Sequence, residues 1–261
     1  MKNNKLIEMD KNFIHLQNSF PHFATIDSTN SYLLQNSFEH GKIIMADYQT
    51  KGRGRKQRKW ETPSQQSLLF SILLKDNLDK LSHFIYTYIS AVSIAEGLAN
   101  YSSELYPALK WPNDVLINHK KVCGILIETK TRSNKLSKVV IGIGLNVNQK
   151  SEFFENDQLQ FGTSLKIATG KPHNRMTLFK NILESIDKNY DLSLKNGEDI
   201  ILDKWRNYCP HLGHEITINT NKGLKTGIFR NITRQGAMLL TINDEIEKFY
   251  AGEVSFDKRS I

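Results

Sequence analysis

Apolar residues recur at helical spacing in two long stretches of the chain, residues 78–101 and 175–194. In each stretch they return every three or four positions, the pattern of a helix that packs one face against a hydrophobic core. We therefore predict two core helices. A further helix is predicted to begin near residues 27–30, where several side chains able to cap a helix precede an apolar run.

Short apolar runs in the same part of the chain predict β-strands. The run at residues 67–74 is apolar on both faces, which is typical of a strand buried inside a sheet. The remaining predicted strands lie at residues 42–45, around Leu109, and at residues 115–118, 122–129 and 138–147. The first 20 residues show no clean periodicity and carry no predicted element.

The pattern changes after Trp205. Four short strand-like runs follow, separated by Gly, Asn and Asp as in a small β-barrel: residues 215–219, 224–233, 237–242 and 246–250. Pro210, a helix breaker, coincides with the change. The predicted fold class is therefore α+β. An N-terminal extension (residues 1–22) precedes a mixed α+β domain (residues 23–209) and a small β domain (residues 210–261).

Composition supports an ordinary globular protein and narrows its partners. Of 261 residues, 39% are hydrophobic and 24% charged, which does not fit a disordered chain. The net charge of +8 favours an anionic partner, whether nucleotide, nucleic acid or acidic protein. No apolar run is long enough for a membrane span or reads as a secretory signal, so we expect a cytoplasmic protein without a membrane partner. Two isolated cysteines exclude a disulfide framework.

A loop at residues 51–59 holds six cations and no acidic residue. Arginine pairs bidentately with phosphate or carboxylate, and the loop glycines allow close approach of a ligand. The loop therefore suits a site that handles several negative charges, such as ATP together with an acid substrate. A solvated loop or a non-specific RNA-binding arm remains the alternative. Trp60 is the only aromatic residue nearby, which argues against base stacking as the main purpose.

Two further segments carry candidate chemistry. Residues 110–114 (KWPND) present a cation, an amide and a carboxylate from a stiff turn, although such a turn can also be structural. A strand opened by Lys120 and Lys121 follows. Because neighbouring side chains on a strand face opposite sides, only one of these lysines can face a pocket; the alternative is a solvated strand end. No dinucleotide-binding, Walker A, nucleophile-elbow or metalloprotease motif occurs, and the histidines show no metal-ligand spacing.

Together these segments resemble the bacterial biotin protein ligases, or biotin–[acetyl-CoA-carboxylase] ligases. The matching motifs keep their order over roughly residues 23–257. They are Asp27-Ser28-Thr29-Asn30, Gln49, Gly52-Arg53-Gly54-Arg55, Lys59-Trp60, Lys110-Trp111-Pro112-Asn113-Asp114, residues 121–128 (KVCGILIE), residues 142–146 (GIGLN), Gln235-Gly236 and Gly252-Glu253. The resemblance implies a mixed-sheet catalytic domain of the biotin/lipoate ligase type, followed by a small SH3-like β-barrel.

The same resemblance implies a two-step reaction with ATP and biotin as substrates and Mg²⁺ as the metal. The carboxylate of biotin attacks the α-phosphate of ATP to give biotinyl-5′-AMP and pyrophosphate. A lysine on a biotin carboxyl carrier domain then attacks this mixed anhydride and releases AMP. Two anions must meet in the first step, so cationic groups are needed to screen their repulsion.

Roles for individual residues also follow from the resemblance. Lys121, at the biotin carboxylate and the α-phosphate, and Arg55 would be catalytic. Biotin would be bound by Ser28, Thr29, Asn30, Gln49, Gly52, Arg53, Gly54, Arg55, Lys121 and Gly124. ATP would be bound by Arg53, Arg55, Trp60, Lys110, Asn113, Asp114 and Asn146, with Trp60 near the adenine and Asp114 a ligand of Mg²⁺.

Two departures from the family pattern matter. Bifunctional members carry an N-terminal winged helix that binds operator DNA, and residues 1–22 are too few to form one. We therefore expect a monofunctional ligase without specific DNA binding, as a monomer or homodimer. A glycine common in the family's basic loop is replaced by Gln57, which bears on the shape of the closed loop.

Two other classes compete with this interpretation. Lipoate ligases share the implied fold and chemistry, but the Gly-Arg-Gly-Arg loop and the Lys-Trp-Pro-Asn-Asp turn favour biotin. A basic RNA-binding module would use the loop as an arm and would have no need for the rigid turn at residues 110–114.

Overall fold

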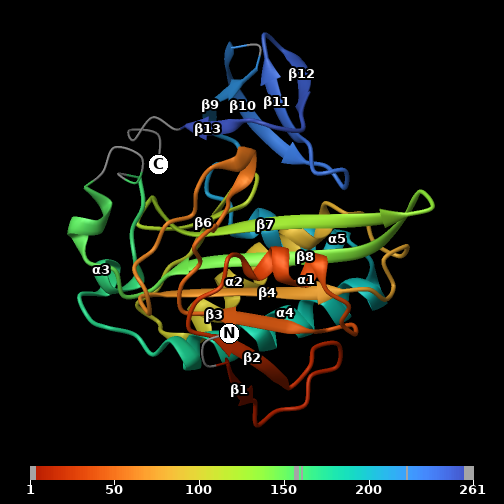
Figure 1. Cartoon of the computed structure of the whole chain (residues 1–261). Coiled ribbons are helices and arrows are strands. Elements are labelled where there is room, and N and C mark those ends of the chain that lie inside the picture. The colour runs from red at the N-terminus through yellow and green to blue at the C-terminus, as the bar shows by residue number, and fades with distance from the viewer. Residues whose placement is uncertain (1–3, 156–158, 160, 222, 256–261) are drawn as a thin grey trace.

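A computed structural model describes residues 4–155, 159, 161–221 and 223–255. Within these residues, eight strands form a mixed sheet in the order β1-β2-β3-β4-β8-β7-β6-β5 (Figure 1). Their bounds are β1 (Asn4–Glu8), β2 (Ser19–Phe23), β3 (Ile43–Ala46), β4 (Ser67–Leu74), β5 (Ala108–Lys110), β6 (Asp114–Ile117), β7 (Lys120–Arg132) and β8 (Lys135–Asn146). Only the β2–β3 pair among them is parallel.

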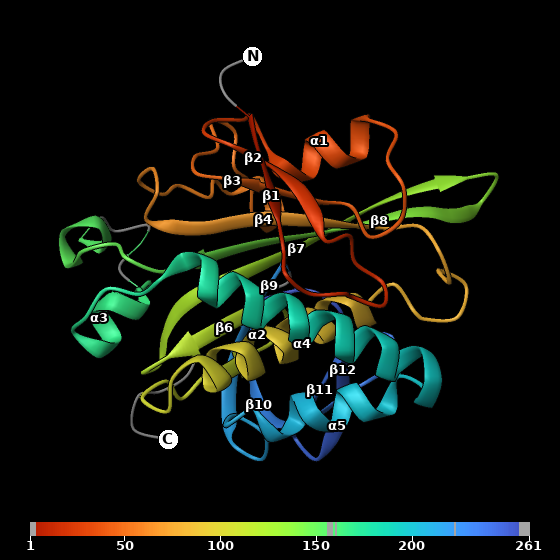
Figure 2. The ribbon, with the colours of Figure 1, turned by 90° about the horizontal axis from the view of Figure 1, so that it is seen from below.

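Helices cover the two faces of this sheet unequally. The helices α2 (Ile85–Tyr101), α4 (Arg175–Asn196) and α5 (Asp199–Asn207) lie together on one face, and α1 (Thr29–Gln35) lies on the other (Figure 2). The main apolar core fills the space between the sheet and the first three helices, and a smaller cluster around Leu33 lies beneath α1. The rest of the α1 face carries polar side chains and the basic loop, and there the candidate site lies.

A second, antiparallel sheet follows in the order β12-β11-β10-β9-β13. Its strands are β9 (Glu215–Thr220), β10 (Gly223–Ile232), β11 (Met238–Ile242), β12 (Glu245–Phe249) and β13 (Glu253–Ser255). The turn between β10 and β11 joins it to the first domain, because the Gly236 carbonyl accepts from Trp111 Nε1 at 3.1 Å and Tyr88 Oη at 3.3 Å.

The structure confirms the predicted α+β class, with a mixed sheet followed by a small β unit. It confirms the buried strand at residues 67–74 and the helix beginning at Arg175, which Asn174 caps. The helix predicted from residue 78 instead begins at Ile85, because Ser82 is bound by the Glu198 carboxylate before α5. The β1–β2 hairpin, α5, β13 and the short helix α3 (Leu165–Thr169) had no predicted counterpart.

The domain limits at residues 22/23 and 209/210 stay predictions. Residues 1–3 of the predicted extension and residues 256–261 of the predicted β domain lie outside the described part of the chain. Among the described helices, none combines the length and apolar character needed to cross a membrane.

Candidate active site

The floor of the site is a pair of glycines on neighbouring strands. Gly124 of β7 lies directly opposite Gly144 of β8, and the indole of Trp60 rests on both. A Cβ at Gly144 would lie 2.5 Å from the indole Cε2, and one at Gly124 would lie 2.9 Å from its Cζ3. The glycines therefore create the space that Trp60 fills.

Lys121 is the cation beside this indole. Its Nζ lies 5.5 Å from the Trp60 ring centroid and 2.7 Å from Asp114 Oδ1 at the start of β6. Lys120 is exposed, so of the two lysines it is Lys121 that reaches the Trp60 side. The catalytic role predicted for Lys121 stays a prediction.

In the turn at residues 110–114, one residue anchors the turn and the others present polar groups to the candidate site. Trp111 is buried and holds the turn to the second sheet through its bond to Gly236. Asn113 donates to the Ile125 carbonyl at 2.8 Å and accepts from Arg55 Nη1 at 3.2 Å, so it links the loop to β7. Burial lowers the pKa of both Lys110 and Arg55, although Asp114 opposes the shift in each case.

A second polar group surrounds the N-terminus of α1. Ser28 caps the helix, and Gln49 Oε1 accepts from the Thr29 backbone N–H at 2.8 Å and from Thr29 Oγ1 at 3.0 Å. A pocket of about 280 Å³ opens here, lined by Ile26, Asp27, Ser28, Ser31, Tyr32, Gln35, Lys51 and Arg53. Of the residues predicted to bind biotin, Ser28 and Arg53 line this pocket.

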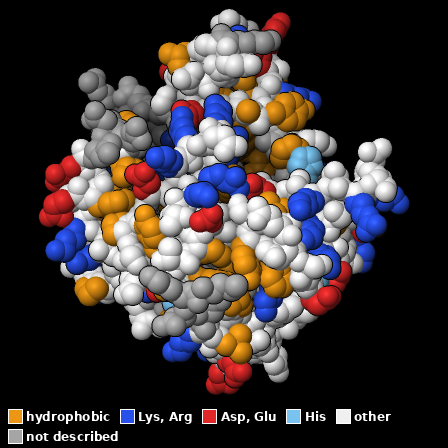
Figure 3. Space-filling model, viewed as in Figure 1, with side chains coloured by type: hydrophobic (Ala, Val, Ile, Leu, Met, Phe, Trp, Pro, Cys, Tyr) orange, Lys and Arg blue, Asp and Glu red, His pale blue; other side chains and the backbone are white. Residues whose placement is uncertain are grey.

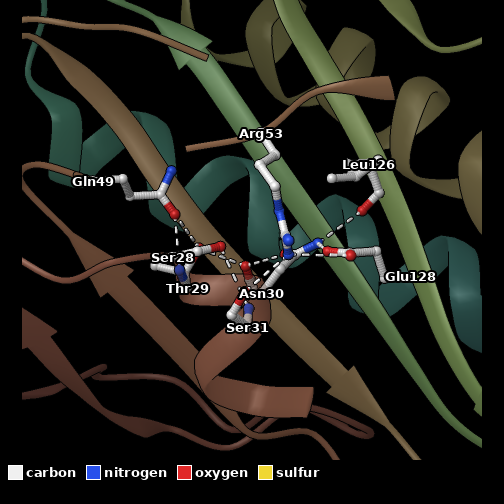
Figure 4. Close-up of polar contacts among 9 residues, drawn as sticks. Ser28, Thr29, Asn30, Ser31, Gln49, Arg53, Leu126 and Glu128 are labelled. Carbon is white, nitrogen blue, oxygen red and sulfur yellow. Dashed lines mark hydrogen bonds and ion pairs between the residues drawn. The ribbon is translucent and has the colours of Figure 1, made fainter. Parts of the chain in front are cut away.

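Asn30 lies at the centre of this group and is fully engaged by the protein (Figure 4). Its Nδ2 donates to Glu128 Oε2 at 2.8 Å and to the Leu126 carbonyl at 3.3 Å, and its Oδ1 accepts from Ser71 Oγ at 2.5 Å. A Cβ at Gly142 would lie 2.3 Å from that Oδ1. Asn30 therefore ties α1 to β4 and β7; the hydrogen bond to biotin predicted for it stays a prediction.

The basic loop is held by acids from other elements. Arg53 Nη2 lies 3.3 Å from Glu128 Oε1 of β7, and Arg58 pairs with Glu253 of β13. The hydrogen bond from Arg58 lowers the pKa of the Glu253 carboxyl. Lys51 pairs with Asp27 at 2.9 Å. Lys and Arg side chains gather on this face of the molecule, beneath the second sheet (Figure 3).

The structure thus brings the predicted residues into two adjoining groups. One includes Trp60, Gly124 and Lys121, with Asp114, Lys110, Asn113 and Arg55 beside them; the other surrounds the start of α1 and holds Ser28, Thr29, Asn30, Gln49 and Arg53. Gly52 packs against Gln49, and Gly54 donates its N–H to the Arg58 carbonyl at 2.7 Å. Asn146 ends β8 two residues after Gly144 and so faces the same side of the sheet.

Three contributors had no predicted role. Ser71 is one of two hydroxyl residues in a strand that is otherwise apolar, a signal that the sequence did contain. Glu128 and Glu253 lie within matching motifs, but their contacts with the basic loop span 75 and 195 positions. No sequence pattern reports such distant ion pairs.

Comparisons with known proteins agree with this geometry. Residues 22–146 match the biotin/lipoate A/B protein ligase family, and residues 211–257 match the biotin protein ligase C-terminal domain. The bifunctional ligase/repressor BirA of Bacillus subtilis is 30% identical over 231 residues, 88% of this chain and 71% of BirA. The biotin–[acetyl-CoA-carboxylase] ligase of Mycobacterium tuberculosis is 27% identical over 88% of this chain and 86% of that protein.

A solved structure extends the likeness to three dimensions. The biotin protein ligase of Aquifex aeolicus in complex with biotin and ATP superposes with a TM-score of 0.78 at 29% identity, covering 93% of this chain and 98% of that one. The sequence matches, the shared fold and the ordered motifs all indicate the same family. The chain belongs to the biotin protein ligase family.

Proposed function

We propose that the protein is an ATP-dependent ligase that activates biotin as biotinyl-5′-AMP and transfers it to a lysine of a biotin carboxyl carrier domain. The observation that carries the proposal is the junction of two unlike polar groups on one face of the sheet. The hydrogen-bonding group at the start of α1 contacts Gly142 through Asn30, and the cationic group around Trp60 contacts Gly144, two positions further along β8. The neutral polar ring of biotin, its carboxylate and the phosphates of ATP can be held side by side there.

In the first step, a carboxylate oxygen of biotin forms a bond to the α-phosphorus of ATP, and the bond from that phosphorus to the bridging oxygen breaks. The electron pair leaves with pyrophosphate. Ser28, Thr29 and Gln49 would hydrogen-bond the polar ring of biotin, and Gly52 and Gly54 would let the loop backbone approach it. Lys121, beside Trp60, would then screen the repulsion between carboxylate and phosphate.

Nucleotide binding is assigned to the groups around Trp60. The indole offers a flat face for adenine, while Lys110, Arg53 and Arg55 supply positive charge for the phosphates. Asn113 orients Arg55 through their 3.2 Å hydrogen bond. In the second step, the carrier lysine attacks the acyl carbon of biotin, and AMP leaves with the electron pair of the broken bond.

Magnesium would enter with ATP. Among the described residues, no cluster of three His, Cys, Asp or Glu side chains could form a dedicated metal cage. Asp114 contributes one carboxylate whose charge partner is Lys121. Mg²⁺ in nucleotide sites is commonly held by one or two carboxylates together with phosphates and waters. Asp114 therefore fits as its protein ligand, and the ion would supply further charge neutralisation at the phosphates.

An exchange assay tests the proposal. Purified protein is mixed with ATP, Mg²⁺ and labelled pyrophosphate. Label should enter ATP only when biotin is present, because biotinyl-AMP must form before it can react back with labelled pyrophosphate. Lipoate serves as the matched control acid, and a carrier domain with its lysine changed to arginine is the control for transfer. Exchange with lipoate but not biotin would contradict the proposal, as would salt-sensitive RNA binding without any exchange.

A further inference from the structure

A buried polar cluster lies where β8 ends, on the side of the sheet that carries Trp60. Thr62, Ser67, Asn146 and Gln149 are at most 6% exposed, and Ser67 and Gln149 are fully buried. Burying polar groups costs free energy unless they are paired. A group of four at one strand end therefore calls for a physical reason.

Gln149 connects the cluster. Its Nε2 donates to Asn146 Oδ1 at 2.8 Å and to Ser67 Oγ at 2.5 Å, and it lies 3.2 Å from Thr62 Oγ1. A carboxamide is planar, with its oxygen and nitrogen on opposite sides. Because Asn146 Oδ1 points to Gln149, Asn146 Nδ2 must point away from the cluster.

The alternation along β8 gives the direction in which Nδ2 points. Asn146 lies two residues beyond Gly144 and so faces the same side of the sheet. That side carries Trp60, which rests on Gly144. None of the described residues accepts a hydrogen bond from Asn146 Nδ2, and it is not among the buried unpaired atoms. The N–H group is thus presented to the space beside Trp60.

The segment that carries Gln149 is itself firmly held. The backbone carbonyl of Gln149 accepts from Ser164 Oγ at 2.7 Å. The side-chain amide of Asn148 bonds the backbone N–H and carbonyl of His173, each at 2.9 Å. These bonds hold the backbone at Gln149, and from it the side-chain Nε2 engages Asn146 Oδ1.

We infer that Gln149 is a positioning residue for nucleotide binding: it locks the Asn146 amide with its N–H group toward ATP. This inference rests on the proposed function. Without Gln149 the amide can rotate by half a turn and present its oxygen instead. An oxygen facing the acceptor atoms of ATP would repel them, so ATP binding should weaken while biotin binding, at the α1 end of the site, should not.

The test compares Gln149→Met with a matched control. Methionine keeps the length and burial of the side chain but has no N–H donor. The control is Asn189→Leu, which removes a buried amide on α4 that donates to Ser93 and Glu96 on the opposite face of the sheet. Equilibrium binding of ATP and of biotin, each measured by calorimetry, reports on both without requiring turnover.

We expect Gln149→Met to raise the Kd for ATP about tenfold, the effect of losing one well-aligned hydrogen bond to a charged group, and to leave the Kd for biotin within about twofold. Asn189→Leu should lower the melting temperature and change neither Kd. Equal weakening of both ligands, or no change in ATP binding, would overturn the inference. Loss of both binding activities would also overturn it, because the biotin pocket must survive.

A double-mutant cycle separates positioning from general stability. If Gln149 acts through Asn146, then Gln149→Met combined with Asn146→Ala should bind ATP no more weakly than Asn146→Ala alone. Additive losses would mean that Gln149 acts by another route. If the unchanged protein showed no biotin-dependent exchange, the proposed function would be refuted. The effect of Gln149→Met on ATP binding could still be measured, because calorimetry requires no turnover.

Discussion

Replacing Lys121 by methionine is the most direct perturbation of the proposed chemistry. Methionine retains the apolar stem that passes Trp60 but removes the charge 2.7 Å from Asp114 Oδ1. Two losses follow from the same substitution. The transition state of adenylation loses a cation between two anions, and the folded protein keeps an Asp114 carboxylate without its partner.

The two losses differ in size. At 2.7 Å the Coulomb attraction of the pair is about 6 kcal/mol for an effective dielectric constant near 20. Most of it is cancelled by desolvation, and Lys121 remains about one-third exposed, so we expect a stability loss of only about 1 kcal/mol. That corresponds to about 3 °C in melting temperature for a chain of this size. Adenylation should fall about 100-fold or more, because the cation is worth most where charge develops.

Pyrophosphate exchange and thermal melting measure these effects separately. Lys120→Met is the matched control, since Lys120 neighbours Lys121 but is exposed, and it should leave both readings near their original values. Adding Asp114→Asn to Lys121→Met should restore stability without restoring exchange. If Lys120→Met abolished exchange and Lys121→Met did not, the assignment of the pocket-facing lysine would be wrong.

Three further predictions follow from the loop and the domain junction. Arg55→Gly breaks the bond to Asn113 and should speed release of biotinyl-AMP about tenfold in stopped-flow measurements with little change in melting temperature; unchanged release would contradict the clamp. Gln57 has a φ of 60°, so Gln57→Gly should retain exchange activity while β-branched Gln57→Val should reduce it, and equal activities would contradict this. Burial lowers the pKa of His211 to about 4, so on acidification the unfolded state takes up the proton first. The free energy of unfolding should therefore fall from pH 6.5 toward pH 4. Urea titrations should show a flatter dependence of this free energy on pH for His211→Gln.

How far the sequence could predict this protein depends on whether the deciding contacts were local. The helix from Arg175 has both an asparagine cap and a regular apolar stripe, and the strand at residues 67–74 is continuously apolar, so each was readable. Leu78 and Leu81 follow helical spacing and are buried, yet they lie outside any helix. There the Glu198 carboxylate binds Ser82 from 116 positions away and overrides the local pattern.

The candidate site shows the same division. The motif residues were identifiable individually, and resemblance assigned their roles, but the orientation of each amide could not be foreseen. Asn30 illustrates this, because Ser71, Leu126 and Glu128 engage both ends of its amide from two different strands. Gln149 gave no signal either, since its partners Thr62 and Ser67 precede it by more than 80 positions.

The basic loop shows why remote partners matter for mechanism. Taken alone, six cations in residues 51–59 should repel one another and keep an empty loop open. In the structure Asp27, which precedes α1, Glu128 of β7 and Glu253 of β13 meet them. Most of these side chains are one-third exposed or more, and pairs of this kind contribute about 1 kcal/mol or less each. They are strong enough to bias the loop toward the site and weak enough for a phosphate or carboxylate to replace them. Ligand binding would therefore exchange one set of counter-charges for another, and the loop need not fold from a self-repelling state.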